Sequence, residues 1–215
     1  MLLLDYTELM LSKKFIFIKY KVFFALLGFS ALVTEVAVTS ERGTFDPAHF
    51  FGYFTILMNI LAFISFLLSA IVTATGKNKH WLDILRSIAT VYIVIVGIGF
   101  ALLLSGLVGV EFTAVPWDNM VLHYIIPAVA LVDFVIDRPK TKFTFKSGLV
   151  WAAVPLVYAA FSIIRGQATG WFPYPFLNPA TSGWLGVIVG VGGLTLVGIA
   201  IIAFVTWVSR FKTSR

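Results

Sequence analysis

Hydrophobic residues along this chain fall into six long runs, separated by short polar connections. A helix needs roughly 20 apolar residues to cross the ~30 Å hydrocarbon core of a bilayer. The runs are too long for strands and lack the alternating polarity of a membrane barrel. They predict an all-α integral membrane protein with one six-helix domain over residues 1–215 and no soluble domain. The predicted spans are Phe15–Val38, Phe51–Ala74, Leu82–Leu107, Asn119–Ile136, Gly148–Ile164 and Gly183–Val208.

The first run is predicted to be a retained signal-anchor that follows a short N-terminal segment, residues 1–14. Its apolar region is longer than the roughly 7–15 residues of a cleaved signal peptide, and no good cleavage site follows Val38.

Composition agrees with a membrane protein. Hydrophobic residues make up 60% of the chain and charged residues 12%, whereas soluble domains carry about 25% charged residues. The absence of cysteine excludes disulfides, thiolate metal sites and cysteine nucleophiles. The net charge of +6 does not indicate nucleic-acid binding, because the basic residues lie between apolar runs, where they specify topology.

Basic residues predict the orientation of the spans. Fourteen of the 16 Lys and Arg residues fall on one side, and only Arg42 and Arg165 fall on the other. Because basic residues concentrate on the cytoplasmic side, we expect both termini in the cytoplasm and the protein in the plasma membrane. The fourteen are Lys13, Lys14, Lys19, Lys21, Lys77, Lys79, Arg86, Arg138, Lys140, Lys142, Lys146, Arg210, Lys212 and Arg215.

The last outward connection, residues 165–182, is rich in proline and aromatic residues. Its three prolines disfavour regular helix, and its aromatic residues are too apolar for a solvated loop. Two interpretations stay open: an anchor in the headgroup region, or a lid over a lipid-accessible pocket.

Polar residues inside the spans are candidates for function, because an ionisable group in a membrane is costly and faces the bundle interior. A rise of 1.5 Å per residue converts their positions into depths, and several reach a similar level near the outer face. The candidates at or just above this level are Glu35, Thr55, Asn59, Asp118, His123 and Arg165.

His123 is distinguished by Pro127, four residues later. Proline has no N–H, so in a regular helix the carbonyl of His123 loses its partner and the helix kinks. Structural roles remain open for each candidate: Thr55 could bond its own backbone, His123 could bond a neighbouring helix, and Glu35 could pair with Arg165.

Two further features are interpreted structurally. The inner half of the spans carries Asp83, Arg86, Asp133 and Asp137, which we expect to form interfacial anchors and ion pairs. The glycine-rich sixth span favours close helix packing and a homo-oligomer through that helix.

Three motifs resemble the androgen-induced-gene family, which includes the androgen-dependent tissue-factor-pathway-inhibitor regulating protein. They are Phe51-Gly-Tyr-Phe-Thr55-Ile-Leu-Met-Asn59, His123-Tyr-Ile-Ile-Pro127 followed by Asp133, and Arg165-Gly166 followed by Gly170-Trp-Phe-Pro-Tyr-Pro-Phe-Leu-Asn178. The chain looks like a bacterial branch of this family of six-helix membrane proteins. The resemblance implies an intramembrane hydrolase of fatty acid esters of hydroxy fatty acids, with Thr55 as nucleophile and His123 as base.

General chemistry is compatible with that implication. A Thr hydroxyl is a weak nucleophile that needs an adjacent base, and a neutral imidazole can fill that role. Asp118, Glu35 or Asn59 could orient the imidazole, and Arg165 could hold a substrate carboxylate. We expect no cofactor and no metal site, and membrane lipids or a lipid-like ester as the partner. The alternative is a non-catalytic membrane protein, either a lipid-binding protein or a small transporter. This alternative predicts polar residues that form a path through both leaflets.

Overall fold

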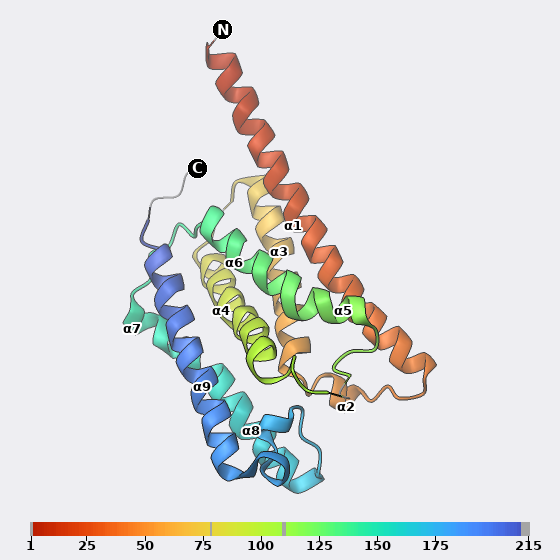
Figure 1. The fold of residues 1–215 in the computed structure, drawn as a ribbon. Helices are drawn as coiled ribbons and strands as arrows, with labels where there is room; N and C mark the ends of the chain where they lie inside the picture. The colour runs from red at the N-terminus through yellow and green to blue at the C-terminus, as the bar shows by residue number, and fades with distance from the viewer. Residues whose placement is uncertain (1, 78, 109–110, 212–215) are drawn as a thin grey trace.

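The computed structural model describes residues 2–77, 79–108 and 111–211, and these form helices joined by short connections (Figure 1). Among the described residues, six helical segments are long and apolar enough to cross a membrane, which confirms the predicted fold class. The α-helices are α1 (Leu2–Glu41), α2 (Pro47–Phe50), α3 (Phe54–Thr75), α4 (His80–Leu103), α5 (Pro116–Met120), α6 (Ile126–Ile136), α7 (Phe145–Gly148), α8 (Ala153–Thr169) and α9 (Pro179–Val208).

The bundle has two ends that differ in what they carry (Figure 1). The start of α1 and the end of α9 lie at one end, with the connections 76–79 and 137–144; we call this the termini side. The connections 42–53, 104–115 and 170–178 lie at the opposite end, the loop side. An even number of spans accounts for the start of α1 and the end of α9 being on one side.

Several boundaries differ from the predicted ones. Helix α1 already begins at Leu2, so the segment 1–14 is largely helical and continuous with the first span. The last loop-side connection is shorter than residues 165–182, because α8 continues to Thr169 and α9 begins at Pro179. A proline in the first helical turn costs no hydrogen bond, so Pro179 starts a helix rather than blocking one. Gly170 ends α8 with a left-handed φ of 76°, which glycine adopts without steric cost.

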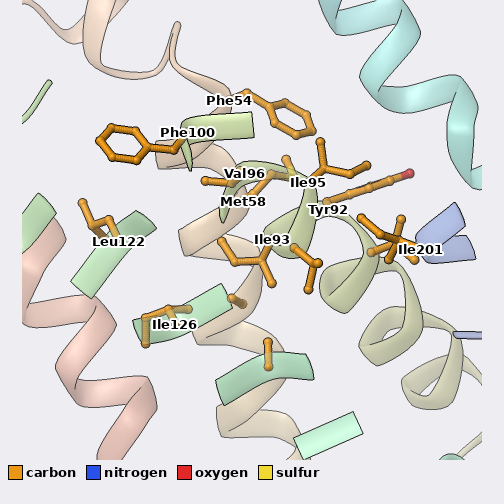
Figure 2. Packing of buried hydrophobic residues seen from close by; sticks show 14 of the residues in the cluster. Phe54, Met58, Tyr92, Ile93, Ile95, Val96, Phe100, Leu122, Ile126 and Ile201 are labelled. Carbon is orange, nitrogen blue, oxygen red and sulfur yellow. The ribbon is translucent and has the colours of Figure 1, made fainter. Parts of the chain in front are cut away.

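Helix α4 lies at the centre of the apolar core. It packs against α3, α6 and α9, and its buried residues meet side chains of the neighbouring helices (Figure 2). Between the two ends of the bundle, the buried apolar positions include Ala62 and Phe66 on α3, Ile93 on α4, and Ile126 and Ala130 on α6. These side chains form an apolar layer across the middle of the bundle.

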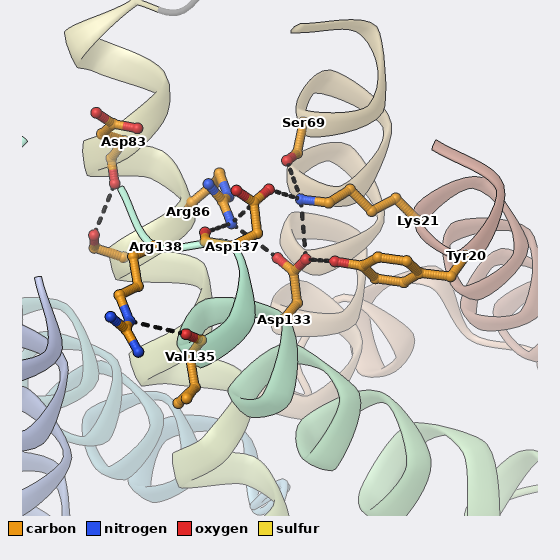
Figure 3. A network of polar contacts seen from close by, with 10 residues as sticks. Tyr20, Lys21, Ser69, Asp83, Arg86, Asp133, Val135, Asp137 and Arg138 are labelled. Atoms are coloured by element: carbon orange, nitrogen blue, oxygen red, sulfur yellow. Dashed lines mark hydrogen bonds and ion pairs between the residues drawn. The ribbon is translucent and has the colours of Figure 1, made fainter. Parts of the chain in front are cut away.

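On the termini side of this layer, four charged side chains form a buried network (Figure 3). Lys21 contacts Asp137 at 2.5 Å and Asp133 at 2.9 Å, and Arg86 contacts the same two carboxylates at 3.4 and 3.0 Å. Lys21 also donates to the hydroxyl of Ser69 at 2.6 Å. Two positive and two negative charges therefore neutralise one another where water is excluded.

This network corrects the interpretation of two basic residues. Lys21 is 0% exposed and Arg86 is 7% exposed, so both side chains lie inside the bundle rather than on its surface. Arg86 joins α4 to the two aspartates of the α6 segment, and Lys21 joins α1 to the same pair. Ion pairs of Arg86 with Asp133 and Asp137 are present, as expected, whereas Asp83 accepts a hydrogen bond from the backbone N–H of Thr141 at 2.9 Å. The ion pairs hold three spans together rather than anchoring each one to the surface.

The glycines of α9 divide between two environments. A side chain at Gly190 would meet Phe176, and one at Gly198 would meet Ile95, so these glycines allow close packing within the chain. Gly192 and Gly193 face open space. An association of chains through this open face stays a prediction.

Candidate functional site

A cavity of about 210 Å³ lies on the loop side. Glu35 of α1, Thr55 of α3 and His123 of the fourth span all line it, so the structure brings together three of the residues that the depth argument selected. We call it the loop-side cavity. Its other lining residues are Thr39, Thr44, Phe45, Asp46, His49, Phe50, Tyr53, Ile56, Phe112, Thr113, Leu122, Trp171 and Tyr174.

Thr55 lies in the first turn of α3, where backbone N–H groups have no helical acceptor. Its N–H donates to the hydroxyl of Tyr174 at 3.1 Å, and its own hydroxyl lies 3.2 Å from the same oxygen. The preceding N–H, of Phe54, donates to the hydroxyl of Tyr158 at 3.1 Å. Two tyrosines from distant parts of the chain thus cap the helix that carries Thr55.

Tyr174 was not among the residues selected from the sequence. It comes from the proline–aromatic connection, where Pro173 and Pro175 flank it and restrict its backbone. Burial raises the pKa of Tyr174, so its hydroxyl stays protonated and can donate to the oxygen of Thr55. The five other aromatic and proline residues around Tyr174 distinguish the segment in the sequence. Nothing in the sequence predicts the contact of Tyr174 with Thr55.

His123 is 4% exposed and stacks on Phe100, with ring centroids 4.0 Å apart. Its Nδ1 lies 3.3 Å from the carbonyl oxygen of Asn119. A carbonyl only accepts, so Nδ1 carries the proton in this contact, and Nε2 of the neutral ring keeps its lone pair. The partner that orients the ring is therefore a backbone carbonyl of the same helix, not the side chain of Asp118, Glu35 or Asn59.

The segment that carries His123 is a π-helical turn, Val121–Ile125, directly before Pro127. In a π turn, hydrogen bonds run from residue i to i+5, so the carbonyl that Pro127 leaves without a donor is that of Leu122. Asn59 supplies the missing donor, since its side-chain amide lies 3.2 Å from the Leu122 oxygen. Pro127 leaves one carbonyl without a helical donor, as expected, but that carbonyl belongs to Leu122, one residue before His123.

Replacing Asn59 by Leu should destabilise the protein by about 1–3 kcal/mol, the usual cost of a buried carbonyl that loses its donor. Asn59 is 1% exposed, so water cannot replace the lost bond. Thermal unfolding in detergent measures the effect. Met58→Leu, which keeps the volume of a neighbouring buried side chain, serves as the control; equal stability of the two variants would argue against the proposed role.

Glu35, which lines the loop-side cavity, lies beside the carboxyl group of Asp118. Glu35 accepts a hydrogen bond from the backbone N–H of Ala114 at 2.6 Å, and its carboxyl interacts with that of Asp118. Asp118 is completely buried. The contact with Ala114 ties α1 to the segment 111–115, of which Phe112 and Thr113 line the cavity.

Arg165 does not line the loop-side cavity within the described part of the chain; it packs behind Trp171. Its guanidinium lies 4.6 Å from the Trp171 ring centroid and donates to the carbonyl of Ala48 at 3.2 Å. His49 stacks on the same ring, with centroids 4.2 Å apart. Arg165 therefore holds the 170–178 connection against α2, and Trp171 stands between it and the cavity.

A second, apolar cavity of about 90 Å³ lies on the other side of Thr55 and Tyr174. These two residues line both cavities, so they separate a polar compartment from an apolar one. A hydroxyl at such a boundary can meet the polar part of an amphiphile whose hydrocarbon part lies in the apolar compartment.

The fold and this site define a multi-pass helical membrane protein with six candidate spans and a polar cavity at one end of the bundle. Comparisons of the chain with protein-family models, curated proteins and solved structures give no match. The resemblance to the androgen-induced-gene family therefore depends on the three motifs alone.

Proposed function

We propose that this protein is an intramembrane hydrolase of lipid esters in which Thr55 is the nucleophile and His123 is the general base. The observation that carries the proposal is the position of Thr55, which lines a polar cavity together with His123 and an apolar cavity on its other side. An ester that joins a hydrocarbon chain to a polar group would have its carbonyl at this boundary.

In the proposed reaction, the Thr55 oxygen attacks the ester carbonyl while Nε2 of His123 takes the hydroxyl proton, directly or through one water. The proton then passes to the leaving alcohol, and an acyl-threonine remains. Water, deprotonated by the same nitrogen, releases the carboxylic acid. The loop-side cavity, at about 210 Å³, is large enough for several waters, since a cavity of about 10–15 Å³ is enough for one.

The N-terminus of α3 would stabilise the negative charge that develops on the carbonyl oxygen. The N–H of Thr55 and the hydroxyl of Tyr174 are donors beside the nucleophile. The positive end of the α3 dipole lies at the same N-terminus. In this structure the hydroxyl oxygen of Tyr174 accepts the hydrogen bond of the Thr55 N–H. The carbonyl oxygen of the substrate would replace it as the acceptor of that N–H.

We further propose that the loop side faces away from the cytoplasm in the plasma membrane. The basic residues that remain on the termini side, apart from the buried Lys21 and Arg86, support this orientation. Fatty acid esters of hydroxy fatty acids are the substrates that the motif resemblance suggests.

A second candidate function is lipid binding without catalysis. It is favoured by the hydrogen bond of the Thr55 hydroxyl to Tyr174 rather than to His123 among the described contacts. A transporter is less well supported, because the apolar layer of Ala62, Phe66, Ile93, Ile126 and Ala130 separates the loop-side cavity from the charged network.

A fluorophosphonate probe tests the hydrolase directly, because it phosphonylates an activated hydroxyl. We expect the purified protein to take up one probe, with mass spectrometry of its peptides locating the adduct on Thr55. Pre-incubation with a long-chain lipid ester should slow the labelling. A protein that takes up no probe, or takes it up at another residue, would favour the lipid-binding function.

A further inference from the structure

The apolar cavity is lined by helices that are distant in sequence, and it is open on one side, where the lining residue Leu156 is 43% exposed. Its walls come from α3, α4, α8, α9 and the 170–178 connection. Representative lining residues are Ile95 on α4, Ala159 on α8, Phe176 in the connection, and Leu194 and Gly198 on α9. Nearly all of this lining is hydrocarbon or aromatic, so the cavity suits a ligand without polar groups along most of its length.

Polar groups are concentrated at one end of the cavity. The hydroxyls of Thr55, Tyr158 and Tyr174 meet there, at the N-terminus of α3. Thr195 also lines the cavity, but its hydroxyl donates to the carbonyl of Val191 in its own helix. A ligand that matches this pattern has one polar group at its end and a hydrocarbon chain behind it.

Helix α8 forms one wall of this cavity. Its opposite face is apolar and exposed, with Val157 at 67%, Phe161 at 60% and Ile164 at 70%. In a membrane, this face meets lipid tails, so the cavity lies beside the acyl chains of the bilayer.

We propose that the apolar cavity binds one acyl chain of a membrane lipid, with the carbonyl carbon of that chain at Thr55. This inference rests on the proposed function and assigns the acyl part of the substrate to a defined compartment. The leaving alcohol then occupies the loop-side cavity. Transfer from bilayer to cavity gives little hydrophobic gain, because both are apolar. Selectivity therefore comes from the length and shape of the cavity and from the hydroxyls at its polar end.

Ala159 offers a way to shorten the cavity. It is a small, partly buried residue on the cavity side of α8, and replacing it by Phe would fill space that the chain needs. Val157→Phe is the matched control, because it introduces the same side chain two residues earlier on the lipid-facing side. Both variants keep α8 apolar, so each should insert and fold.

Two readouts test the assignment. A palmitate analogue that carries a mid-chain diazirine is photolysed with each purified protein, and the modified peptides are identified by mass spectrometry. In parallel, turnover of p-nitrophenyl palmitate is divided by turnover of p-nitrophenyl butyrate. We expect crosslinks to α4, α8 and α9 residues that line the cavity. Ala159→Phe should lower both the crosslinking and the turnover ratio by about tenfold, a typical effect of pocket fit, whereas Val157→Phe should change neither.

The two readouts separate this inference from the proposed hydrolase. Crosslinks that are lost in Ala159→Phe support the acyl site even without ester turnover, and in that case the hydrolase fails and a lipid-binding protein remains. Equal crosslinking of all three proteins, or crosslinks confined to lipid-facing residues, overturns the acyl site, even if Thr55-dependent turnover is present.

Discussion

Replacing Thr55 by Ala should lower the turnover of a lipid ester by on the order of 10³-fold or more, because loss of the nucleophile leaves only binding and electrostatic stabilisation. The substitution removes one hydroxyl and keeps the backbone N–H that Tyr174 caps. The loss should therefore fall on kcat rather than on KM, and the stability of the protein should change little. Initial rates over a range of ester concentrations measure both constants.

His123→Ala should reduce turnover by roughly 10²–10⁴-fold, the usual contribution of a general base. Thr75→Ala is the control for Thr55→Ala, because it makes the same change in the same helix, where the Thr75 hydroxyl donates to the carbonyl of Ile71 on the termini side. Turnover that survives in Thr55→Ala at the level of this control would exclude the proposed nucleophile.

Lys21→Met should destabilise the protein by about 3–5 kcal/mol, the usual cost of removing one partner from a buried ion pair. Lys21 is fully buried and contacts both Asp133 and Asp137. Without it, Arg86 faces two carboxylates, and one negative charge remains unpaired away from water (Figure 3). Unfolding in detergent, followed by circular dichroism, measures the difference.

Lys19→Met is the matched control, because Lys19 is exposed on the same helix two residues earlier. It should cost less than about 1 kcal/mol, as expected for an exposed charge. Combining Lys21→Met with Asp137→Asn restores the charge balance and should recover part of the loss. If Lys21→Met is as stable as Lys19→Met, the network does not hold α1 against the bundle.

The loop-side cavity and the charged network have different relations to the proposed chemistry. The network is neutral overall and its charges contact one another, so it fixes the packing of α1, α4 and α6. The cavity contains side chains whose contacts are to backbone groups or to a hydroxyl, as for His123 and Thr55. Such groups can replace these hydrogen bonds by bonds to a substrate or to water. The free-energy cost is smaller than that of separating a buried charge from its partner.

Part of the site could be predicted because depth in a membrane helix follows from sequence position. The spans alternate in direction and each residue rises 1.5 Å, so Glu35, Thr55 and His123 were expected at one level, and they line one cavity. Depth does not give rotation about the helix axis. Arg165 is at the expected end of the bundle, but it lies behind Trp171.

The sequence by itself determined the number of spans, because hydrophobic length and the requirement for internal backbone hydrogen bonds leave few alternatives in lipid. It also determined that Pro127 disturbs the fourth span near His123, since proline has no N–H to donate. Both follow from local chemistry.

Only the tertiary structure decided the partner of Thr55. Tyr174 lies 119 residues away in sequence, and nothing in the spacing of the two residues brings them together. The same holds for Lys21: its place in the sequence predicted a topology signal, whereas in the structure it is buried and pairs with two aspartates of the α6 segment. Which side chains meet depends on how six helices rotate and pack, and this is set by the sum of many contacts rather than by any one segment.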